Sequence, residues 1–283
     1  MPPRSSPTPR QQRLGVELRK LRERAGLSAA EAASMLGVDR AKVSSIETGR
    51  VGLSAERVRA IACQYDCADQ ALIDALAAMT GRRTHRWWEE YQGVLPTGFL
   101  DLAELEHHAV KLRTSQTATL PGLLQTADHA RALFQQAVPE LPPHELEHRV
   151  SHCMKRQVVL DRDQPLEYTA IIHEAALRMQ FGGKAVVRAQ LRHIAEMGER
   201  DHITVLVLPF EAGAFPGPGQ TVLYAFGPVP QLDTVQLDAA HGLAFLDAEA
   251  QLGKYRSILD RLESLALEAS ESRDFIHHVA KTL

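Results

Sequence analysis

The sequence from Leu14 to Arg50 reads LGVELRKLRERAGLSAAEAASMLGVDRAKVSSIETGR, and the N-terminal part of the chain is interpreted outward from it. Its first leucines recur at positions i, i+4 and i+7 among Arg, Lys and Glu, which predicts an amphipathic helix. Gly26 follows the pattern and is expected to end that helix in a left-handed conformation. The leucines are Leu14, Leu18 and Leu21.

Two shorter helices follow, each with its own start and stop signals. Ser28 and Glu31 form an S-x-x-E capping box, in which hydroxyl and carboxylate accept hydrogen bonds from free amides at the helix start. Asp39 is expected to cap a third helix after a break at Gly37. A short helix, a turn containing glycine and a second short helix are typical of a helix-turn-helix motif.

The third helix is expected to point Val43 and Ile46 inward, so that its polar residues face outward. Arg and Lys match the edges of guanine in the major groove and hydroxyl groups suit any base, so this face predicts DNA contacts. The alternative is a small helical bundle with a solvated polar face. The expected DNA-binding residues are Arg40, Ala41, Lys42, Ser44 and Ser45, with Ser28 and Arg50 beside them.

The string LRKLRERAGLSAAEAASMLGVDRAKVSSIETGR resembles the helix-turn-helix of the Cro and phage repressors, the Xre-type regulators, over about residues 14–66. The resemblance implies an ion pair between Arg22 and Glu47 that would fix the recognition helix. The family often has Gln at the start of the second helix, where it touches DNA, whereas this chain has Ala29. Dimerisation, or a basic arm in the minor groove, would compensate for that lost contact.

Length and charge divide the chain. Its 283 residues predict two domains. Residues 1–80 carry 12 Lys and Arg against 9 Asp and Glu, whereas the remaining residues carry 20 against 26. Because the N-terminal part is basic and the rest of the chain is acidic, the N-terminal part is predicted to bind a polyanion.

Several classes of protein are not expected. No apolar run is long enough to span a bilayer, and the Pro- and Ser-rich start does not resemble a secretory signal. Three cysteines without metal-site spacing indicate a reduced, cytoplasmic protein with no membrane partner, and we expect Cys63 and Cys67 to be small core residues. The expected segments are a disordered basic arm (1–13), the helix-turn-helix domain (14–80), a connector (81–100) and a larger domain (101–283).

The second part mixes short β-branched runs with helices. Runs bounded by Pro, Gly or Asp predict strands at 166–172, 203–208, 221–226 and 234–237. The fold class is therefore α+β and mostly helical: an N-terminal all-α helix-turn-helix domain and a larger C-terminal mixed α/β domain with a small sheet. Helices are expected at 185–197 and around 247–268 and 271–282.

The strings LPGLLQTADHARAL, HEAALRMQFGG and ITVLVLPFEAGAFPGPG resemble the C-terminal domain of actinobacterial Xre-type regulators of the WhiJ-like group. The resemblance implies a domain with no established catalytic activity, a very small partner protein encoded by a neighbouring gene, and an antitoxin-like repressor role. Where that group usually has Tyr, Tyr and Glu, this chain has His129, Gln236 and Asp238. If these residues line a pocket, the preference for a ligand or partner differs.

One motif suggests an enzyme. The run His144-Glu145-Leu146-Glu147-His148 is an H-E-x-x-H, which on a helix would hold zinc with two imidazoles and use Glu145 as a base. The chain has 13 histidines, and the motif follows Pro142-Pro143 in what would be an exposed first turn, so a chance match is favoured. We expect no metal, no cofactor and no enzyme. A zinc-dependent hydrolase using residues 144–148 remains the alternative.

The sequence therefore predicts a DNA-binding transcriptional regulator, a repressor of antitoxin-like type that binds double-stranded operator DNA as a homodimer. Its second domain is expected to dimerise through the closing helices (247–282) and to sense a small partner protein or a ligand. An interaction module that has lost DNA binding is a further alternative. The ligand or partner candidates are Trp87, Trp88, His129, His173, Gln236 and Asp238, although the Trp pair could instead pack the connector.

Overall fold

The chain divides into two compact units in the computed structural model, which describes residues 7–80, 86–217, 219–239 and 242–283. The first unit is built from helices, and the second holds a six-stranded sheet with helices. The predicted α+β class is therefore confirmed. The first unit comprises residues 1–86 and 228–232, and the second comprises residues 87–227 and 233–283.

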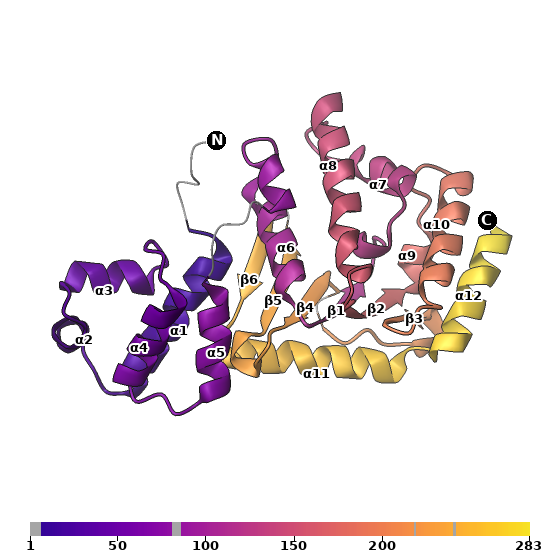
Figure 1. Ribbon diagram of the computed structural model, residues 1–283. Helices are drawn as coiled ribbons and strands as arrows, with labels where there is room; N and C mark the ends of the chain where they lie inside the picture. The colour runs from indigo at the N-terminus through magenta and orange to yellow at the C-terminus, as the bar shows by residue number, and fades with distance from the viewer. Residues whose placement is uncertain (1–6, 81–85, 218, 240–241) are drawn as a thin grey trace. The chain divides into compact units, whose positions relative to one another are not determined.

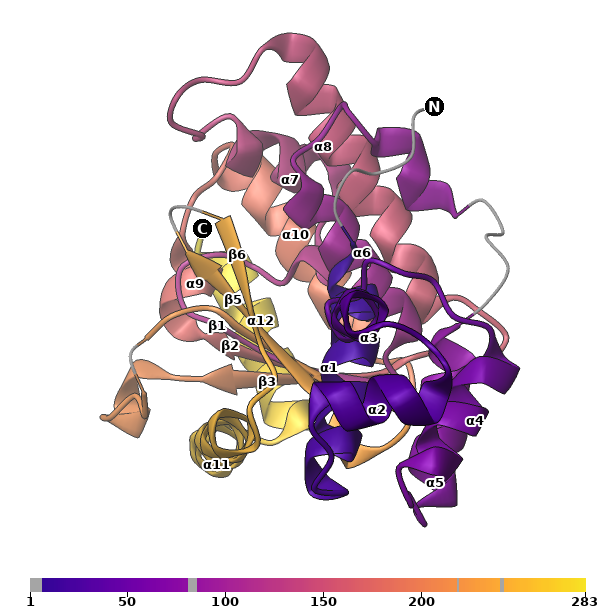
Figure 2. The same ribbon diagram turned by 90° about the vertical axis from the view of Figure 1, so that its left-hand side faces the viewer.

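The first unit packs its helices around one apolar core, to which Leu18, Ile46 and Leu76 contribute buried side chains. The two short helices α2 and α3 run at a steep angle to each other, so that Figure 2 shows α3 nearly end-on beside α2. Its helices are α1 (Pro9–Arg24), α2 (Ala29–Leu36), α3 (Arg40–Glu47), α4 (Ala55–Gln64) and α5 (Gln70–Met79).

The first helix begins earlier than the sequence analysis predicts. Thr8 caps α1 in a box with Gln11, and Pro9 occupies the first helical position, where its missing N–H is not needed. Residues 9–13 therefore belong to α1, which corrects the expectation of a disordered arm over residues 1–13. Residues 1–6 of that arm lie outside the described residues.

Two glycines allow the N-terminal half of α1 and the end of α3 to approach closely. A Cβ atom on Gly15 would lie 2.6 Å from the carbonyl oxygens of Ile46 and Glu47. A Cβ atom on Gly49, whose φ is +72°, would lie 2.5 Å from the carbonyl oxygen of Gln11. Neither position has room for a larger residue, so both glycines help to set the position of α3.

The second unit is a mixed sheet with helices on both faces. The strand order is β3-β2-β1-β4-β5-β6, with β1, β2 and β3 parallel and the other neighbours antiparallel. The strands are β1 (Lys111–Gln116), β2 (Glu167–His173), β3 (Ile203–Leu208), β4 (Val222–Phe226), β5 (Thr234–Ala239) and β6 (Gly242–Leu246). The helices are α6 (Thr97–His108), α7 (Ala127–Phe134), α8 (Pro143–Arg156), α9 (Glu174–Arg178), α10 (Lys184–Met197), α11 (Glu249–Leu265) and α12 (Ala269–Thr282).

The sheet separates two apolar cores of this unit. One core joins the sheet to α10 and α12, and the other joins the opposite face to α11, which runs along the sheet in Figure 1. The closing helices α11 and α12 place their apolar residues in these cores, including Leu259 and Val279, both fully buried. Because these residues are buried within the unit, they are not available for the dimer contact that we expected at the closing helices (247–282).

The structure differs from the sequence analysis at three further points. Strands β1 and β6 were not predicted. Within the predicted connector (81–100), residues 81–85 lie outside the described residues, whereas residues 87–91 form a 3₁₀ helix of the second unit. Cys63 is exposed instead of buried.

Among the described residues, no helix combines the length and the apolar character that crossing a membrane would require.

Candidate nucleic-acid interface

The outer face of α3 carries polar side chains on a helix whose inner face is fixed by the core. Val43 and Ile46 are buried, with 1% and 6% of their surface exposed. Asp39 caps the helix, because its carboxylate accepts a hydrogen bond from the Lys42 amide at 2.6 Å. On the outer face, Arg40, Ala41, Lys42 and Ser44 are exposed and Ser45 is half-buried.

Three cations on this face are not engaged within the described part of the chain. The side chains of Arg40, Lys42 and Arg50 make no hydrogen bond or ion pair with any described residue. Their charges and N–H groups are therefore open to phosphates and base edges. By contrast, Arg59 on α4 is paired with Asp74 at 3.0 Å.

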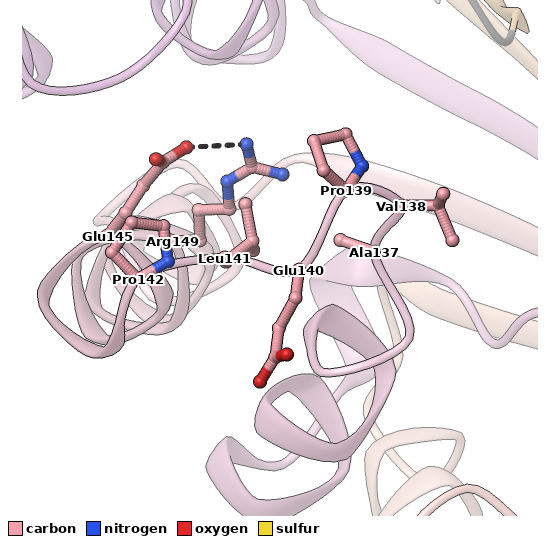
Figure 3. Close-up of a pocket in the computed structure, with 8 residues that line it drawn as sticks. All are labelled: Ala137, Val138, Pro139, Glu140, Leu141, Pro142, Glu145 and Arg149. Atoms are coloured by element: carbon pink, nitrogen blue, oxygen red, sulfur yellow. Dashed lines mark hydrogen bonds and ion pairs between the residues drawn. The ribbon is translucent and has the colours of Figure 1, made fainter.

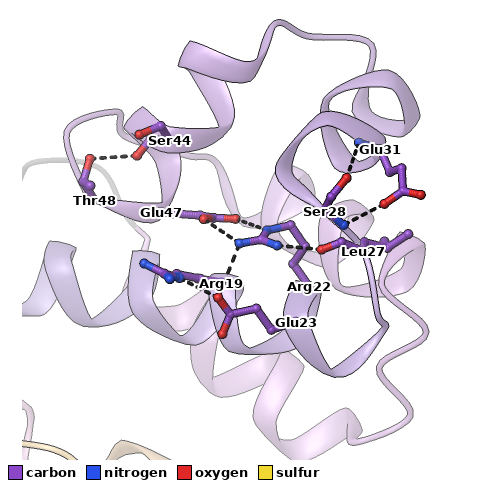
Figure 4. A network of polar contacts seen from close by, with 9 residues as sticks. All are labelled: Arg19, Arg22, Glu23, Leu27, Ser28, Glu31, Ser44, Glu47 and Thr48. Atoms are coloured by element: carbon purple, nitrogen blue, oxygen red, sulfur yellow. Dashed lines mark hydrogen bonds and ion pairs between the residues drawn. The ribbon is translucent and has the colours of Figure 1, made fainter.

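The hydroxyl groups in the predicted set have different roles. Ser45 Oγ donates to the Ala41 carbonyl oxygen at 2.8 Å, within the same helix. Ser28 Oγ accepts a hydrogen bond from the Glu31 amide, and Glu31 in turn accepts one from the Ser28 amide at 2.8 Å (Figure 4). Ser28 is therefore a capping residue of α2, and of the three serines only Ser44 has a hydroxyl without a partner among the described residues.

Arg22 and Glu47 form a bidentate ion pair at the end of α3 (Figure 4). Arg22 Nε donates to Glu47 Oε1 at 2.6 Å and Nη2 donates to Oε2 at 3.1 Å, while Nη1 donates to the Leu27 carbonyl oxygen at 2.6 Å. The two side chains are only 9% and 11% exposed. The hydrogen bond that Arg22 donates to Glu47 raises the pKa of Arg22. One guanidinium thus links α1, the end of α3 and the turn before α2.

Tyr65 is a buried residue near the Arg22–Glu47 pair that the sequence analysis did not identify. It follows α4, is 5% exposed, and has its pKa raised by burial and next by the charge of Glu47. The ring therefore lies near the Arg22–Glu47 pair. The only sequence signal is its position four residues after Ile61, in line with the apolar stripe of α4.

The residues at which the second domain differs from the WhiJ-like group, His129, Gln236 and Asp238, lie in two separate places. His129 on α7 is fully buried beside Phe181, with ring centroids 5.8 Å apart, and neither ring nitrogen has a partner among the described residues. Burial lowers the pKa of His129 to about 4. Gln236 is buried on β5 and donates to Asp238 at 2.9 Å. No hydrogen bond or ring contact between described residues joins these two places.

The Trp pair lies in an aromatic cluster of the second unit. The rings of Trp87 and Trp88 are 5.6 Å apart and nearly perpendicular. His152 on α8 packs against Trp87 and Tyr91 at 5.2 and 5.1 Å, is fully buried, and has its pKa lowered to about 3 by burial and next by Arg156. These contacts pack residues 87–91 against α8.

His173 ends β2 at the carboxyl edge of the parallel strands. Its Nδ1 accepts a hydrogen bond from the Ala175 amide at 3.1 Å, so the ring proton is assigned to Nε2. The rings of Phe210 and Phe215 lie 5.2 and 5.8 Å from it. The imidazole that carries this N–H donor therefore packs against two aromatic rings.

The H-E-x-x-H motif lies in the first turns of α8, where His144 and His148 are exposed. The Glu145 carboxylate is paired with Arg149 at 2.7 Å, beside a hollow of about 280 Å³ that residues 137–142 complete (Figure 3). Within the described ranges, no group of three or more His, Cys, Asp or Glu is placed to hold a metal ion. The motif therefore has two imidazoles but neither a free base nor a third ligand among those residues.

Comparison with known families agrees with the division of the chain. Residues 13–76 match the family described as a helix-turn-helix domain, which indicates a DNA-binding regulator. Residues 99–278 match the family described as a domain of unknown function (DUF5753). Neither a search of curated proteins nor one of solved structures found a match. The second match spans more than half of the chain, so the chain belongs to the DUF5753 family. A helix-turn-helix domain precedes the DUF5753 domain.

Proposed function

We propose that the chain is a sequence-specific transcriptional regulator that places α3 in the major groove of double-stranded DNA. The observation that carries the proposal is the set of unengaged cations, Arg40, Lys42 and Arg50, on and just after a helix fixed by the Arg22–Glu47 pair. A preorganised helix loses little conformational entropy on docking, so the charge of these residues contributes to affinity. We place this activity in the cytoplasm, where such a protein meets its DNA.

The regulator is proposed to act as a two-fold dimer. One recognition helix contacts only a few base pairs, and a single small domain rarely reaches the affinity of a specific regulator. Two copies on a two-fold axis read two half-sites about one helical turn apart. The absence of the usual Gln at Ala29 increases the need for a second copy.

We assign the dimer contact to the outer edge of β6 in place of the closing helices. At the other end of the sheet, the β3 edge is covered, because Val207 donates to Ser272 Oγ at 2.9 Å and accepts from the Leu267 amide at 2.9 Å. Among the described strands, β6 has a neighbour on one side only. An edge strand with free amides and carbonyls pairs readily with a copy of itself about a two-fold axis.

The second unit is proposed to sense a small partner protein or ligand at the carboxyl edge of its parallel strands. Ligands of open sheets containing parallel strands bind at this edge. His173 supplies an oriented N–H donor there, and Phe210, which is 56% exposed, supplies an apolar wall. Binding at this edge would change the affinity of the regulator for its operator, which in an antitoxin-like repressor relieves or strengthens repression.

The test is selection of duplexes from a random pool by the full chain, followed by light scattering. We expect a two-fold symmetric consensus with half-sites about one helical turn apart and a dimer at micromolar concentration. An Ala244→Lys variant should be monomeric and bind more weakly, because like charges would meet across the β6 contact. Enrichment of no common sequence would favour an interaction module that has lost DNA binding. A monomer that binds a single asymmetric site tightly would overturn the dimer.

A further inference from the structure

Two of the three cysteines open to the same hollow on the first unit. Cys63 lies in the last turn of α4 and Cys67 lies just after it, before α5. Both line a hollow of about 420 Å³. The remaining lining residues are Arg59, Asp66, Ala68, Gln70 and Ile73.

The backbone at the end of α4 holds the two cysteines within one turn. The Asp66 amide donates to the Cys63 carbonyl oxygen at 3.1 Å, and the Cys67 amide donates to the Ala62 carbonyl oxygen at 3.0 Å. Asp66 has a φ of +52°, which completes a left-handed C-terminal cap with an aspartate in the place usually taken by glycine. This cap turns the chain so that both thiols line one side of the unit.

The three cysteines differ in their access to reagents. Cys63 is exposed and Cys67 is half-buried, whereas Cys153 in the second unit is 2% exposed. Burial also raises the pKa of the Cys153 thiol, which disfavours its reactive thiolate form. Only the pair on the first unit is therefore open to a dissolved reagent.

The same turn carries contacts that hold the helix-turn-helix. Gln64, between the two cysteines, donates to the Met35 carbonyl oxygen of α2 at 3.4 Å. Tyr65, the next residue, is buried with its hydroxyl influenced by Glu47 of the Arg22–Glu47 pair. A disulfide between Cys63 and Cys67 would therefore affect both α2 and the end of α3.

We propose that Cys63 and Cys67 form a dithiol modification site that exchanges with small disulfides, the oxidised forms of low-molecular-weight thiols. The exposed Cys63 thiolate attacks one sulfur of the small disulfide, forms a mixed disulfide and releases one thiolate. The Cys67 thiolate then attacks the Cys63 sulfur, forms the Cys63–Cys67 disulfide and displaces the second thiolate. Two protein thiols are oxidised and one small disulfide is reduced to two thiols, so atoms and electrons balance.

The first test uses oxidised glutathione with the full reduced chain and mass spectrometry. We expect wild type to lose two hydrogens, with a peptide linking Cys63 to Cys67 and Cys153 still free. Cys67→Ser should instead retain one glutathione on Cys63, and Cys63→Ser should form no internal disulfide. A stable glutathione adduct on Cys63 of wild type, or equal modification of all three cysteines, would overturn the proposal.

The second test measures the consequence for DNA binding and rests on the proposed function. Its probe is the duplex selected on the reduced chain. The oxidised wild type should bind that duplex about tenfold more weakly, with recovery on reduction. Cys63→Ser, which forms no internal disulfide, should bind it equally before and after treatment with oxidised glutathione. Unchanged affinity of the oxidised wild type would overturn the link to α2 and α3. If no duplex is selected at all, the proposed function fails, whereas the mass measurement still decides the dithiol site.

Discussion

The outer face of α3 in the first unit and the sheet of the second unit use charged side chains in opposite ways. On the first unit, the cations of α3 are exposed and have no partner among the described residues. In the second unit, the buried guanidinium of Arg113 on β1 is paired with Asp260 at 2.7 Å and with Glu263 at 2.9 Å. Arg156 is paired with the fully buried Glu106 at 2.8 Å. Arginine is thus free for an anionic partner on the outer face of α3, whereas in the second unit it holds the fold together, as Arg22 also does at the end of α3.

Histidine makes a second contrast between the units. The described residues of the first unit include no histidine, whereas in the second unit His129 and His152 are fully buried with no partner for either ring nitrogen among those residues. A buried imidazole without a hydrogen bond stays neutral, because its charged form would lose hydration without compensation. Lowering the pH should therefore reduce the stability of the second unit.

The largest expected effect follows from these two imidazoles. Burial lowers the pKa of His129 to about 4 and that of His152 to about 3. Below about pH 6.5 the unfolded chain binds protons that the folded chain does not bind, so stability present at pH 7 is lost as the pH falls toward 4. Each imidazole should remove about 3 kcal/mol over that range. The fluorescence of the two Trp residues, Trp87 and Trp88, reports denaturant unfolding of the second unit alone.

A variant sharpens this prediction. His129→Leu removes one of the two fully buried imidazoles and should reduce the loss of stability between pH 7 and pH 4 by about 3 kcal/mol. A pH dependence identical to that of wild type would show that His129 is not the source.

The next effect concerns the buried ion pair of the second unit. Glu106→Ala leaves the Arg156 guanidinium buried without its carboxylate, and it should lower the free energy of unfolding by about 3–5 kcal/mol. The matched control is Glu147→Ala, because Glu147 is exposed and paired with Arg131 at 2.8 Å, and it should leave the free energy of unfolding nearly unchanged. Denaturant unfolding followed by Trp fluorescence checks both variants, and equal losses would contradict the distinction.

The corresponding effect in the first unit is smaller. Glu47→Ala leaves Arg22 with the Leu27 carbonyl oxygen as its main partner, so the first unit should lose about 2–3 kcal/mol. Hydrogen exchange of the amides of α1 and α3 measures this loss without interference from the second unit. Asp74→Ala, which breaks the exposed pair with Arg59 and does not touch Arg22, is the control and should leave exchange nearly unchanged. Protection of α3 that survives Glu47→Ala would show that the pair does not hold the helix.

Elements could be predicted from the sequence where the residues that stabilise them are close to one another in the chain. The capping signal at the start of α2 lies within four consecutive residues, and so does that of α3. The sequence alone therefore placed both helices. The start of α1 was missed although Thr8, Pro9 and Gln11 carried the signal. These helices depend on local contacts, which a single sequence displays.

Strand β1 shows why the rest could not be foretold. Its sequence, KLRTSQ, is too polar to resemble a central strand. The polar side chains are stabilised by distant residues: Arg113 by α11, and Thr114 by the Tyr168 hydroxyl at 2.9 Å. For the same reason the influence of Glu47 on buried Tyr65, and the hollow shared by Cys63 and Cys67, became visible only in the folded chain.

The smallest effect separates two roles of one serine. Ser28 was expected to contact DNA, and in the structure it caps α2. Ser28→Ala should lower the stability of the first unit by about 1 kcal/mol and leave the selected DNA consensus unchanged. Thermal unfolding followed by circular dichroism, together with repeated duplex selection, checks both parts. A changed consensus at normal stability would mean that Ser28 reads DNA.

The most direct measurement of the central claim is the affinity of the full chain for its selected duplex across a salt series, for wild type, Arg40→Ala and Lys42→Ala. If α3 lies in the major groove, Arg40→Ala should cost about 1–3 kcal/mol and relax the preference at one base pair. Lys42→Ala should weaken binding and, if it contacts phosphate, reduce the salt slope by about 1. Arg59→Ala, on the paired cation of α4, should bind as wild type does. Affinities and salt slopes of Arg40→Ala and Lys42→Ala that equal those of wild type and of Arg59→Ala would contradict the claim.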